Sequence, residues 1–180
     1  MDDLPLLFRA LQFAAQKHRH QRRKGGKDIP YINHPIDVAT MLATVGGVRD
    51  ANVLAAALLH DTVEDTDTSP EEITREFGAE IASLVAEVTD DPDLTSAERK
   101  IRQEEEAPLK SPGAKLIRLA DKTCNVHDIT HAPPPSWSLE RRAAYFEWAD
   151  RVVAGLRGSN DALERRFDEY LAIARSSTAR

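Results

Sequence analysis

The stretch AAALLHDTVEDT, residues 55–66, joins an apolar run to four ionisable side chains within six positions. The four are His60, Asp61, Glu64 and Asp65. At about 100° per residue on a helix, they fall within about 140° of one another and share one side. Burying a charge costs several kcal/mol unless the charge is paired or ligates a metal. The stretch therefore predicts either a solvated helix end or a bound ion, and we favour the ion.

The composition is typical of one globular domain spanning residues 1–180, with 41% hydrophobic and 30% charged residues. One cysteine, Cys124, excludes an internal disulfide and a Cys-rich zinc site, and it fits a reducing compartment. The chain starts with the acidic pair Asp2-Asp3 and lacks a basic signal-peptide region. No apolar run approaches the roughly 20 residues that span a bilayer. We therefore expect a cytoplasmic protein with no membrane partner.

Basic residues are concentrated near the N-terminus, although the net charge of the chain is −6. The negative total argues against nucleic acid as a partner. A small, multiply phosphorylated ligand suits a local basic patch on an acidic protein, and a solvated basic loop is the alternative. The segment 17–27 holds the patch and contains no acid; its basic residues are Lys17, Arg19, Arg22, Arg23, Lys24 and Lys27.

Apolar spacing and capping residues predict an all-α fold, a helical bundle of about nine helices. We find no segment with convincing strand alternation, no repeat and no low-complexity tract. The charged segment 95–106 is interpreted as a solvated face or a lid, and residues 176–180 as a frayed tail. The expected helices cover residues 4–22, 35–44, 50–65, 70–77, 79–89, 95–106, a stretch from 112 onward, 139–157 and 161–174.

Two further side chains occupy positions that favour ligation. His34 precedes Pro35 at a predicted helix start, where a ring nitrogen can be directed into the protein. Asp121 lies in an apolar helical stripe between Ile117 and Cys124, where an unpaired carboxylate is costly. Capping and surface exposure are the alternatives for Asp121, and neither suits a mid-helix position.

Two imidazoles and two carboxylates from three predicted helices form a candidate ligand set: His34, His60, Asp61 and Asp121. A nitrogen and oxygen set without thiolate suits Mn²⁺ or Fe²⁺, and Zn²⁺ less well. Such an ion activates a water molecule and polarises a phosphoryl oxygen. Glu64 and Asp65 then act as general base or orient the ligands, while the basic segment, Arg141 and Tyr145 hold phosphates. The combination predicts a phosphohydrolase.

Three motifs, in order, resemble the hydrolase domain of RelA/SpoT-type proteins within the HD superfamily of phosphohydrolases. They are QRRKGGKDIPYINHP at 21–35, AALLHDTVEDT at 56–66 and KLIRLADKTCNV at 115–126. The five residues between Lys24 and Pro30 resemble instead the stand-alone small alarmone hydrolases, including the animal SpoT-like type. SPGAK at 111–115 and YFEWA at 145–149 point the same way. The resemblance extends from about residue 8 to residue 170.

This resemblance implies one Mn²⁺ ion on the four candidate ligands, with Glu64 and Asp65 activating the attacking water. The implied reaction is attack of metal-bound water on the phosphorus attached to the ribose 3′-oxygen of guanosine 3′-diphosphate 5′-di- or triphosphate. Pyrophosphate and GDP or GTP are released. The resemblance also implies five nucleotide contacts: Arg23 and Lys24 with base and phosphates, Asn125 near ribose and base, and Arg141 and Tyr145 with phosphates.

The same residues are compatible with other functions. Animal-type relatives also remove the 2′-phosphate of NADPH, and a general HD phosphodiesterase or a non-catalytic alarmone-binding module are further alternatives. Thr123-Cys124 replaces bulkier residues found in relatives, which leaves base preference open. We expect hydrolysis alone, because 180 residues leave no room for synthetase and regulatory domains. The sequence does not predict an oligomeric state.

Overall fold

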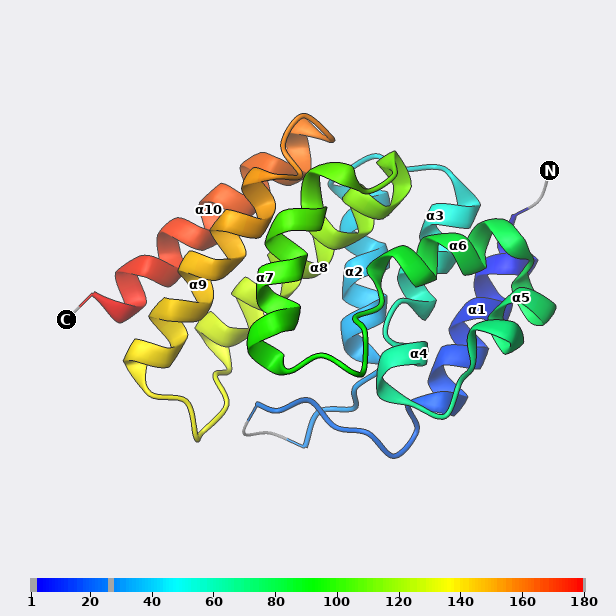
Figure 1. Ribbon diagram of the computed structural model, residues 1–180, viewed down its shortest axis with the longest axis horizontal. Helices are drawn as coiled ribbons and strands as arrows, with labels where there is room; N and C mark the ends of the chain where they lie inside the picture. Colours follow the sequence, from blue (N-terminus) through cyan, green and yellow to red (C-terminus); the bar gives the residue numbers. More distant parts are fainter. Residues whose placement is uncertain (1–2, 26–27, 180) are drawn as a thin grey trace.

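The fold is a bundle of α-helices, which confirms the all-α expectation. A computed structural model describes residues 3–25 and 28–179. Within these residues, extended pairing is limited to an isolated antiparallel bridge between Arg22 and Pro30. Figure 1 shows the helices in chain order: α1 (Leu4–Lys17), α2 (Asn33–Thr44), α3 (Ala51–Leu59), α4 (Thr62–Asp65), α5 (Pro70–Phe77), α6 (Ala79–Val88), α7 (Ser96–Glu106), the 3₁₀ turn η1 (Ala107–Leu109), α8 (Pro112–His131), α9 (Leu139–Ala154) and α10 (Asp161–Thr178).

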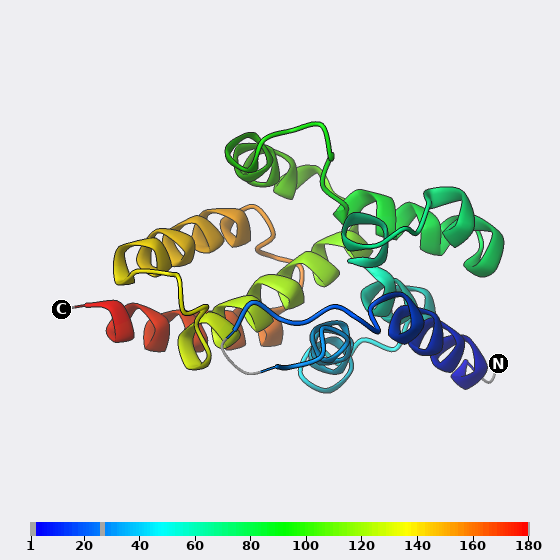
Figure 2. The same cartoon turned by 90° about the horizontal axis from the view of Figure 1, so that it is seen from below.

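Helix α8 is the centre of the bundle and packs against α2, α3, α6, α9 and α10. Figures 1 and 2 show α1 toward one end of the molecule, α9 and α10 toward the other, and α8 between them. Ile117, Leu119 and Ala120 of α8 are fully buried, as is most of the apolar run of α3. Because α8 is enclosed, its polar residues Asp121 and Lys122 are buried too and require polar partners.

The predicted helix 50–65 is wrong in one respect, because it is interrupted after Leu59. Helix α3 ends there, and α4 begins at Thr62. The Thr62 hydroxyl donates to the carbonyl of Leu59 at 2.6 Å, and His60 Nδ1 donates to the carbonyl of Ala57 at 2.8 Å. These side chains compete for carbonyls that a continuing helix would bind. The four ionisable residues therefore do not share one helix, and Asp61 lies between two helices.

Two other boundaries near the site differ from the prediction. Helix α1 ends at Lys17 instead of near residue 22, and the chain then folds back on itself. In that turn the Arg23 N–H donates to the carbonyl of Ile29 at 2.9 Å. Helix α2 begins at Asn33, earlier than the expected start at Pro35. Backbone hydrogen bonds in the turn thus replace the last predicted turn of the first helix.

The expected frayed tail is wrong for residues 176–178, because α10 continues to Thr178. The Ser177 hydroxyl donates to the carbonyl of Ala174 at 2.7 Å and helps to satisfy the helix end. Gly26 and Lys27 of the predicted basic segment, the acidic Asp2, and Arg180 of the tail lie outside the described residues.

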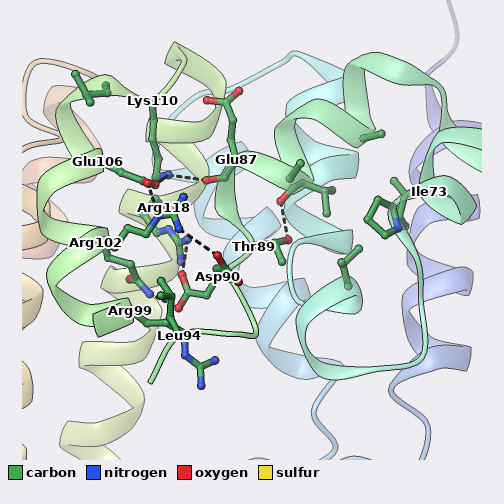
Figure 3. A pocket seen from close by; sticks show the side chains of 18 residues that line it. Ile73, Glu87, Thr89, Asp90, Leu94, Arg99, Arg102, Glu106, Lys110 and Arg118 are labelled. Atoms are coloured by element: carbon green, nitrogen blue, oxygen red, sulfur yellow. Dashed lines mark hydrogen bonds and ion pairs between the residues drawn. The ribbon is translucent and has the colours of Figure 1, made fainter. Parts of the chain in front are cut away.

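Among the described residues, two open cavities of similar size border α8. One, of about 500 Å³, is lined by residues of α2, α4, α8 and α9 and of the segment 21–25. The other, of about 490 Å³, lies between α6, α7 and α8 (Figure 3). No helix of the described part of the chain is long and apolar enough to cross a membrane.

Candidate functional site

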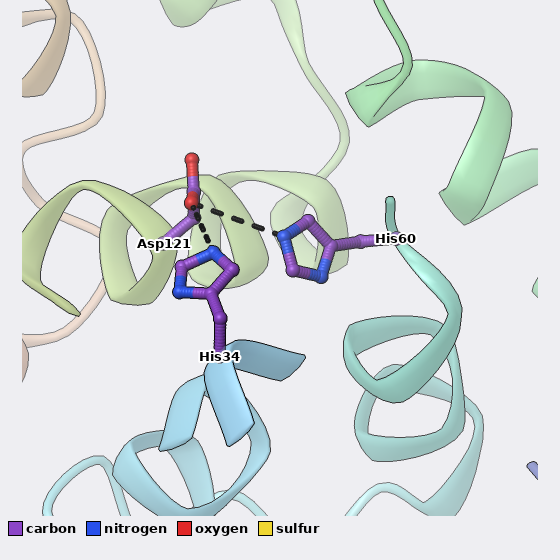
Figure 4. A group of neighbouring side chains, drawn as sticks. All are labelled: His34, His60 and Asp121. Atoms are coloured by element: carbon purple, nitrogen blue, oxygen red, sulfur yellow. Dashed lines mark hydrogen bonds and ion pairs between the residues drawn. The ribbon is translucent and has the colours of Figure 1, made fainter. Parts of the chain in front are cut away.

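Three buried side chains from separate parts of the chain converge beside α8 (Figure 4). His34 comes from the first turn of α2, His60 from the end of α3, and Asp121 from the middle of α8. Their ligand atoms all lie within 4.8 Å of one another. The Oδ1 of Asp121 lies 3.1 Å from His34 Nε2 and 3.8 Å from His60 Nε2. This spacing suits side chains that share one ion.

Asp61 lies beside this group of three and approaches each histidine with a different carboxylate oxygen. Its Oδ1 lies 3.1 Å from His60 Nε2, and its Oδ2 lies 3.7 Å from His34 Nε2. The Tyr31 hydroxyl donates to Asp61 Oδ2 at 2.6 Å. Burial and the Asp61 charge raise the pKa of Tyr31 well above its usual value, so Tyr31 remains a neutral donor. Asp61 thus lies at the break between α3 and α4 and contacts both histidines.

The orientation of His60 favours a bound cation. Because Nδ1 donates to the carbonyl of Ala57, the neutral ring presents the lone pair of Nε2 to the carboxylates of Asp61 and Asp121. This Nε2 is buried and has no hydrogen-bond partner among the described residues. Burial lowers the pKa of His60, but the two carboxylates outweigh burial and raise it to about 9. The group thus attracts a proton or a metal ion, and its donor set fits a divalent ion.

Neighbouring polar groups keep Asp121 ionised. Burial raises the pKa of its carboxyl, but Lys122 and His34 lower it well below the usual range. The Lys122 ammonium lies 3.2 Å from Asp121 Oδ2, and Asn125 Nδ2 donates to Oδ1 at 2.5 Å. Hydrogen bonds of this kind orient a ligand carboxylate. Asn125, predicted to contact nucleotide, therefore also contacts a candidate metal ligand.

The cavity of about 500 Å³ brings most of the predicted residues together. Arg23 donates to Asn125 Oδ1 at 2.9 Å and to Asp128 Oδ2 at 2.7 Å, and its guanidinium lies over the Tyr31 ring at 5.4 Å. Arg23 is thus fixed in orientation, whereas Lys24 is exposed. The predicted site residues that line the cavity are Arg23, Lys24, His34, Asp61, Glu64, Asp65, Asn125 and Tyr145.

Glu64 and Asp65 are held by contacts from distant parts of the chain. Glu64 Oε2 accepts from the backbone N–H of Asp90 at 3.2 Å, and its Oε1 lies 3.8 Å from the Arg99 guanidinium. Asp65 Oδ2 accepts from Gln21 Nε2 at 2.9 Å. Burial and the Asp90 charge raise the pKa of Glu64. A raised pKa makes a carboxylate a better general base.

Comparisons with known proteins agree with this geometry. A family model described as HD domain matches residues 10–152. The chain belongs to the HD domain family. It is 55% identical over 163 residues to guanosine-3′,5′-bis(diphosphate) 3′-pyrophosphohydrolase MESH1 of Mus musculus, covering 91% of each chain. The MESH1 of Drosophila melanogaster is 51% identical over 159 residues, covering 88% of this chain and 89% of that one.

A solved structure is also similar to this HD domain. It is described as a metazoan ortholog of SpoT that hydrolyzes ppGpp and plays a role in starvation responses. The TM-score is 0.91 at 48% sequence identity, and the match covers 93% of this chain and 94% of the other. The family expected from the three sequence motifs is therefore confirmed.

Three predicted residues of this HD domain do not line the described cavity: His60 and Asp121, which are buried behind it, and Arg141. Arg141 is exposed, and its guanidinium lies over the Trp137 ring at 4.5 Å. Trp137 lines the cavity, and its ring centroid lies 5.7 Å from that of Tyr145. Arg141 and Tyr145, which are four residues apart, therefore both contact Trp137, and the sequence prediction did not include this tryptophan.

Three further residues of the HD domain escaped the sequence prediction: Tyr31, Gln21 and Lys122. Tyr31 and Gln21 bond to Asp61 and Asp65, which are more than 25 positions away in the sequence. Lys122 could have been predicted from the sequence, because a lysine within an apolar helix needs a buried partner.

Proposed function

We propose that this protein hydrolyses the 3′-pyrophosphate of guanosine alarmones in a manganese-dependent reaction. The substrates are guanosine 3′-diphosphate 5′-di- or triphosphate, and the products are pyrophosphate and GDP or GTP. The reaction takes place in the cytoplasm. The observation that carries the proposal is the convergence of His34, His60 and Asp121, with Asp61 beside them, next to a cavity that holds Glu64, Asp65 and the cationic Arg23 and Lys24. The similarity to the MESH1 proteins supports the choice of substrate.

His34, His60, Asp61 and Asp121 would hold the ion. A bound Mn²⁺ lowers the pKa of a water molecule and polarises a phosphoryl oxygen. Mn²⁺ suits two imidazoles and two carboxylates with open positions, and Fe²⁺ suits them too; Zn²⁺ more often takes four ligands only. The hydrogen bonds from Tyr31 and Asn125 orient the two carboxylates toward the shared centre.

Glu64 is the proposed general base. Its carboxylate accepts a proton from the attacking water, and the Asp90 N–H and the Arg99 guanidinium hold it in place. Asp65, which accepts a hydrogen bond from Gln21, is proposed as the second acid next to the attacking water. A general base of this kind contributes about 10²–10⁴ to the rate.

The nucleotide is held by cationic and polar groups of the cavity wall. Arg23 presents a guanidinium of fixed orientation, and Lys24 adds an exposed ammonium for phosphates. Asn125 contributes near ribose and base, and Tyr145 binds the outer phosphates. Arg141, which lies over the cavity residue Trp137 without lining the cavity itself, is proposed to assist Tyr145. We assign to this cavity a small phosphorylated guanosine nucleotide, not a nucleic acid.

The test is hydrolysis of guanosine tetraphosphate in ¹⁸O-labelled water with manganese-loaded protein. Attack on the phosphorus attached to the ribose 3′-oxygen places the label in pyrophosphate and none in GDP. Metal-stripped protein is the control, and it should regain turnover when Mn²⁺ is added. Label in the nucleotide, release of single phosphates, or undiminished turnover without metal would contradict the proposal.

A further inference from the structure

Two histidines near the end of α8 lie outside the candidate active site. They are His127 and His131, the first and last residues of the stretch HDITH at 127–131. Residues four apart on a helix project from the same face. Zinc-binding helices use this spacing to present two imidazoles to one ion. Neither histidine lines the cavity that holds the proposed reaction, so the pair is a separate candidate for a metal site.

The two imidazole rings lie next to each other. Their centroids are 4.3 Å apart, and their planes are inclined by 32°. Zn–N bonds are about 2.0–2.1 Å long, so two nitrogen ligands of a tetrahedral Zn²⁺ ion lie about 3.3 Å apart. Rings at the observed separation are therefore within chelating range. The Tyr170 ring of α10, whose centroid is 4.8 Å from that of His127, packs against His127 and restricts its movement.

The Nδ1 atoms of both rings face oxygen acceptors. His131 Nδ1 donates to the carbonyl of His127 at 2.8 Å, and His127 Nδ1 lies 3.6 Å from Asp128 Oδ1. Asp128 pairs with Arg23 through its other oxygen, Oδ2, at 2.7 Å. A histidine that binds a metal usually directs its second ring N–H at a carbonyl or a carboxylate in this way, and the contact fixes the tautomer.

The Nε2 atoms of the two rings are therefore the available ligand atoms. With the proton on Nδ1, each neutral ring carries its lone pair on Nε2. Among the residues that the structure describes, neither Nε2 has a hydrogen-bond partner. His131 is exposed, and 43% of the His127 side chain is exposed, so a hydrated ion can reach both.

The position of the pair in α8 also favours a cation. His131 is the last residue of the helix, where carbonyl groups without helical partners give a partial negative charge. The Asp128 carboxylate next to His127 adds negative charge, and the chain as a whole carries a net charge of −6. A divalent ion at the pair is thus stabilised by its surroundings as well as by its two ligands.

We propose that His127 and His131 chelate a divalent transition-metal ion of the class that prefers imidazole, such as Zn²⁺, through their Nε2 atoms. Water molecules complete the coordination. Imidazole nitrogen suits Zn²⁺, Cu²⁺ and Ni²⁺, whereas Mn²⁺ prefers oxygen ligands and does not compete for this site. The inference does not depend on alarmone hydrolysis, because the pair lies outside the site of that reaction.

The test is equilibrium dialysis of the untagged protein against Zn²⁺, with bound zinc counted by elemental mass spectrometry. Wild-type protein should bind one more ion per chain than His131→Gln. Removal of one imidazole should weaken binding about a hundredfold, because the second ligand of a chelate acts at a high effective concentration. Equal zinc binding by the two proteins, across the concentrations at which the wild type saturates, would overturn the proposal.

Two further variants make the count specific. His127→Gln should lose the same single ion, and circular dichroism confirms that each variant folds. His20→Gln is the matched control, because His20 is an exposed histidine away from the pair, and this variant should bind as much zinc as the wild type. An equal loss in His20→Gln would show unspecific binding to surface imidazoles and refute the site. A failure of the core site to bind zinc lowers the count in all four proteins alike, so it is distinguishable from a failure of this proposal.

Discussion

The candidate metal ligands and the candidate catalytic acids belong to one site but are held differently. His34, His60 and Asp121 are 2%, 2% and 5% exposed; Asp121 projects from α8, and the two histidines come from α2 and the end of α3, which pack against it. Glu64 and Asp65 are exposed on the single turn of α4 and are held by Asp90 and Gln21. The proposed ion site thus belongs to the folded core, whereas the proposed catalytic acids depend on contacts near the surface. Substitutions should therefore separate metal binding from turnover.

Loss of a core ligand should have the largest effect. Asp61→Ala removes a carboxylate that lies within 3.1 Å of His60 and 3.7 Å of His34. We expect the variant to lose bound manganese and turnover together, as measured by elemental mass spectrometry and by kcat. Asp93→Ala, an exposed acid outside the cavity, is the control. Full metal occupancy in Asp61→Ala would remove Asp61 from the ligand set.

Glu64→Gln should separate metal binding from turnover. The variant should keep manganese and nucleotide affinity while kcat falls by about 10²–10⁴. Burial and Asp90 raise the pKa of Glu64, so the acidic limb of the wild-type rate profile should lie above the usual glutamate range and should vanish in the variant. Glu71→Gln on α5 is the matched control. Retained turnover would exclude Glu64 as the base.

In the absence of metal, the free energy of unfolding should depend on pH, because His60 is charged beside Asp61 and Asp121 in the folded protein. Burial lowers the pKa of His60, but Asp61 and Asp121 raise it to about 9 in the folded protein. Since the unfolded value is about 6.5, the stabilisation is complete below about pH 6.5 and is lost as pH rises through about 9. The free energy of unfolding of metal-free protein should fall by up to about 3 kcal/mol over this window.

Urea unfolding at about pH 6, 8 and 10 measures this change. The metal-loaded protein is the comparison, because an ion in place of the proton removes the protonation step. A metal-free protein whose stability does not fall between these values would contradict the assignment of a charged His60.

A surface contact should have the smallest effect. Gln21→Leu removes the hydrogen bond to Asp65, and we expect kcat to fall about tenfold while bound manganese is unchanged. Gln12→Leu, an exposed change on α1, controls for the general effect of an apolar substitution. Loss of manganese in Gln21→Leu would show that the surface contacts and the core ligands are not separable.

The sequence was sufficient to predict the fold class, and it was sufficient to propose the candidate ligands. Burying an unpaired charge costs free energy, and this applies to the carboxylate in the apolar stripe of α8 and to the His-Asp pair after the buried run of α3. These residues can therefore be recognised as candidate ligands without knowledge of the fold. That they approach one another was a hypothesis from their donor chemistry, and the resemblance supported it. The structure then placed His34, His60 and Asp121 within reach of one ion.

Other features depend on hydrogen bonds and ring contacts that local sequence patterns do not predict. The helix break after Leu59 arises when side chains of His60 and Thr62 take backbone carbonyls, and helical spacing alone gives no sign of it. The contact between Tyr31 and Asp61 joins positions far apart in the chain. Arg141 has the spacing of a cavity residue but stacks on Trp137 instead.

The most direct test of the central claim compares two nucleotides with the same manganese-loaded protein. Guanosine tetraphosphate and NADPH are incubated separately, and kcat/KM is obtained from released pyrophosphate and released phosphate. If the protein is an alarmone hydrolase, pyrophosphate is released much faster from guanosine tetraphosphate than phosphate is from NADPH. Faster release of phosphate from NADPH would make the protein a 2′-phosphatase on the same scaffold, and the absence of both products would contradict a hydrolytic function.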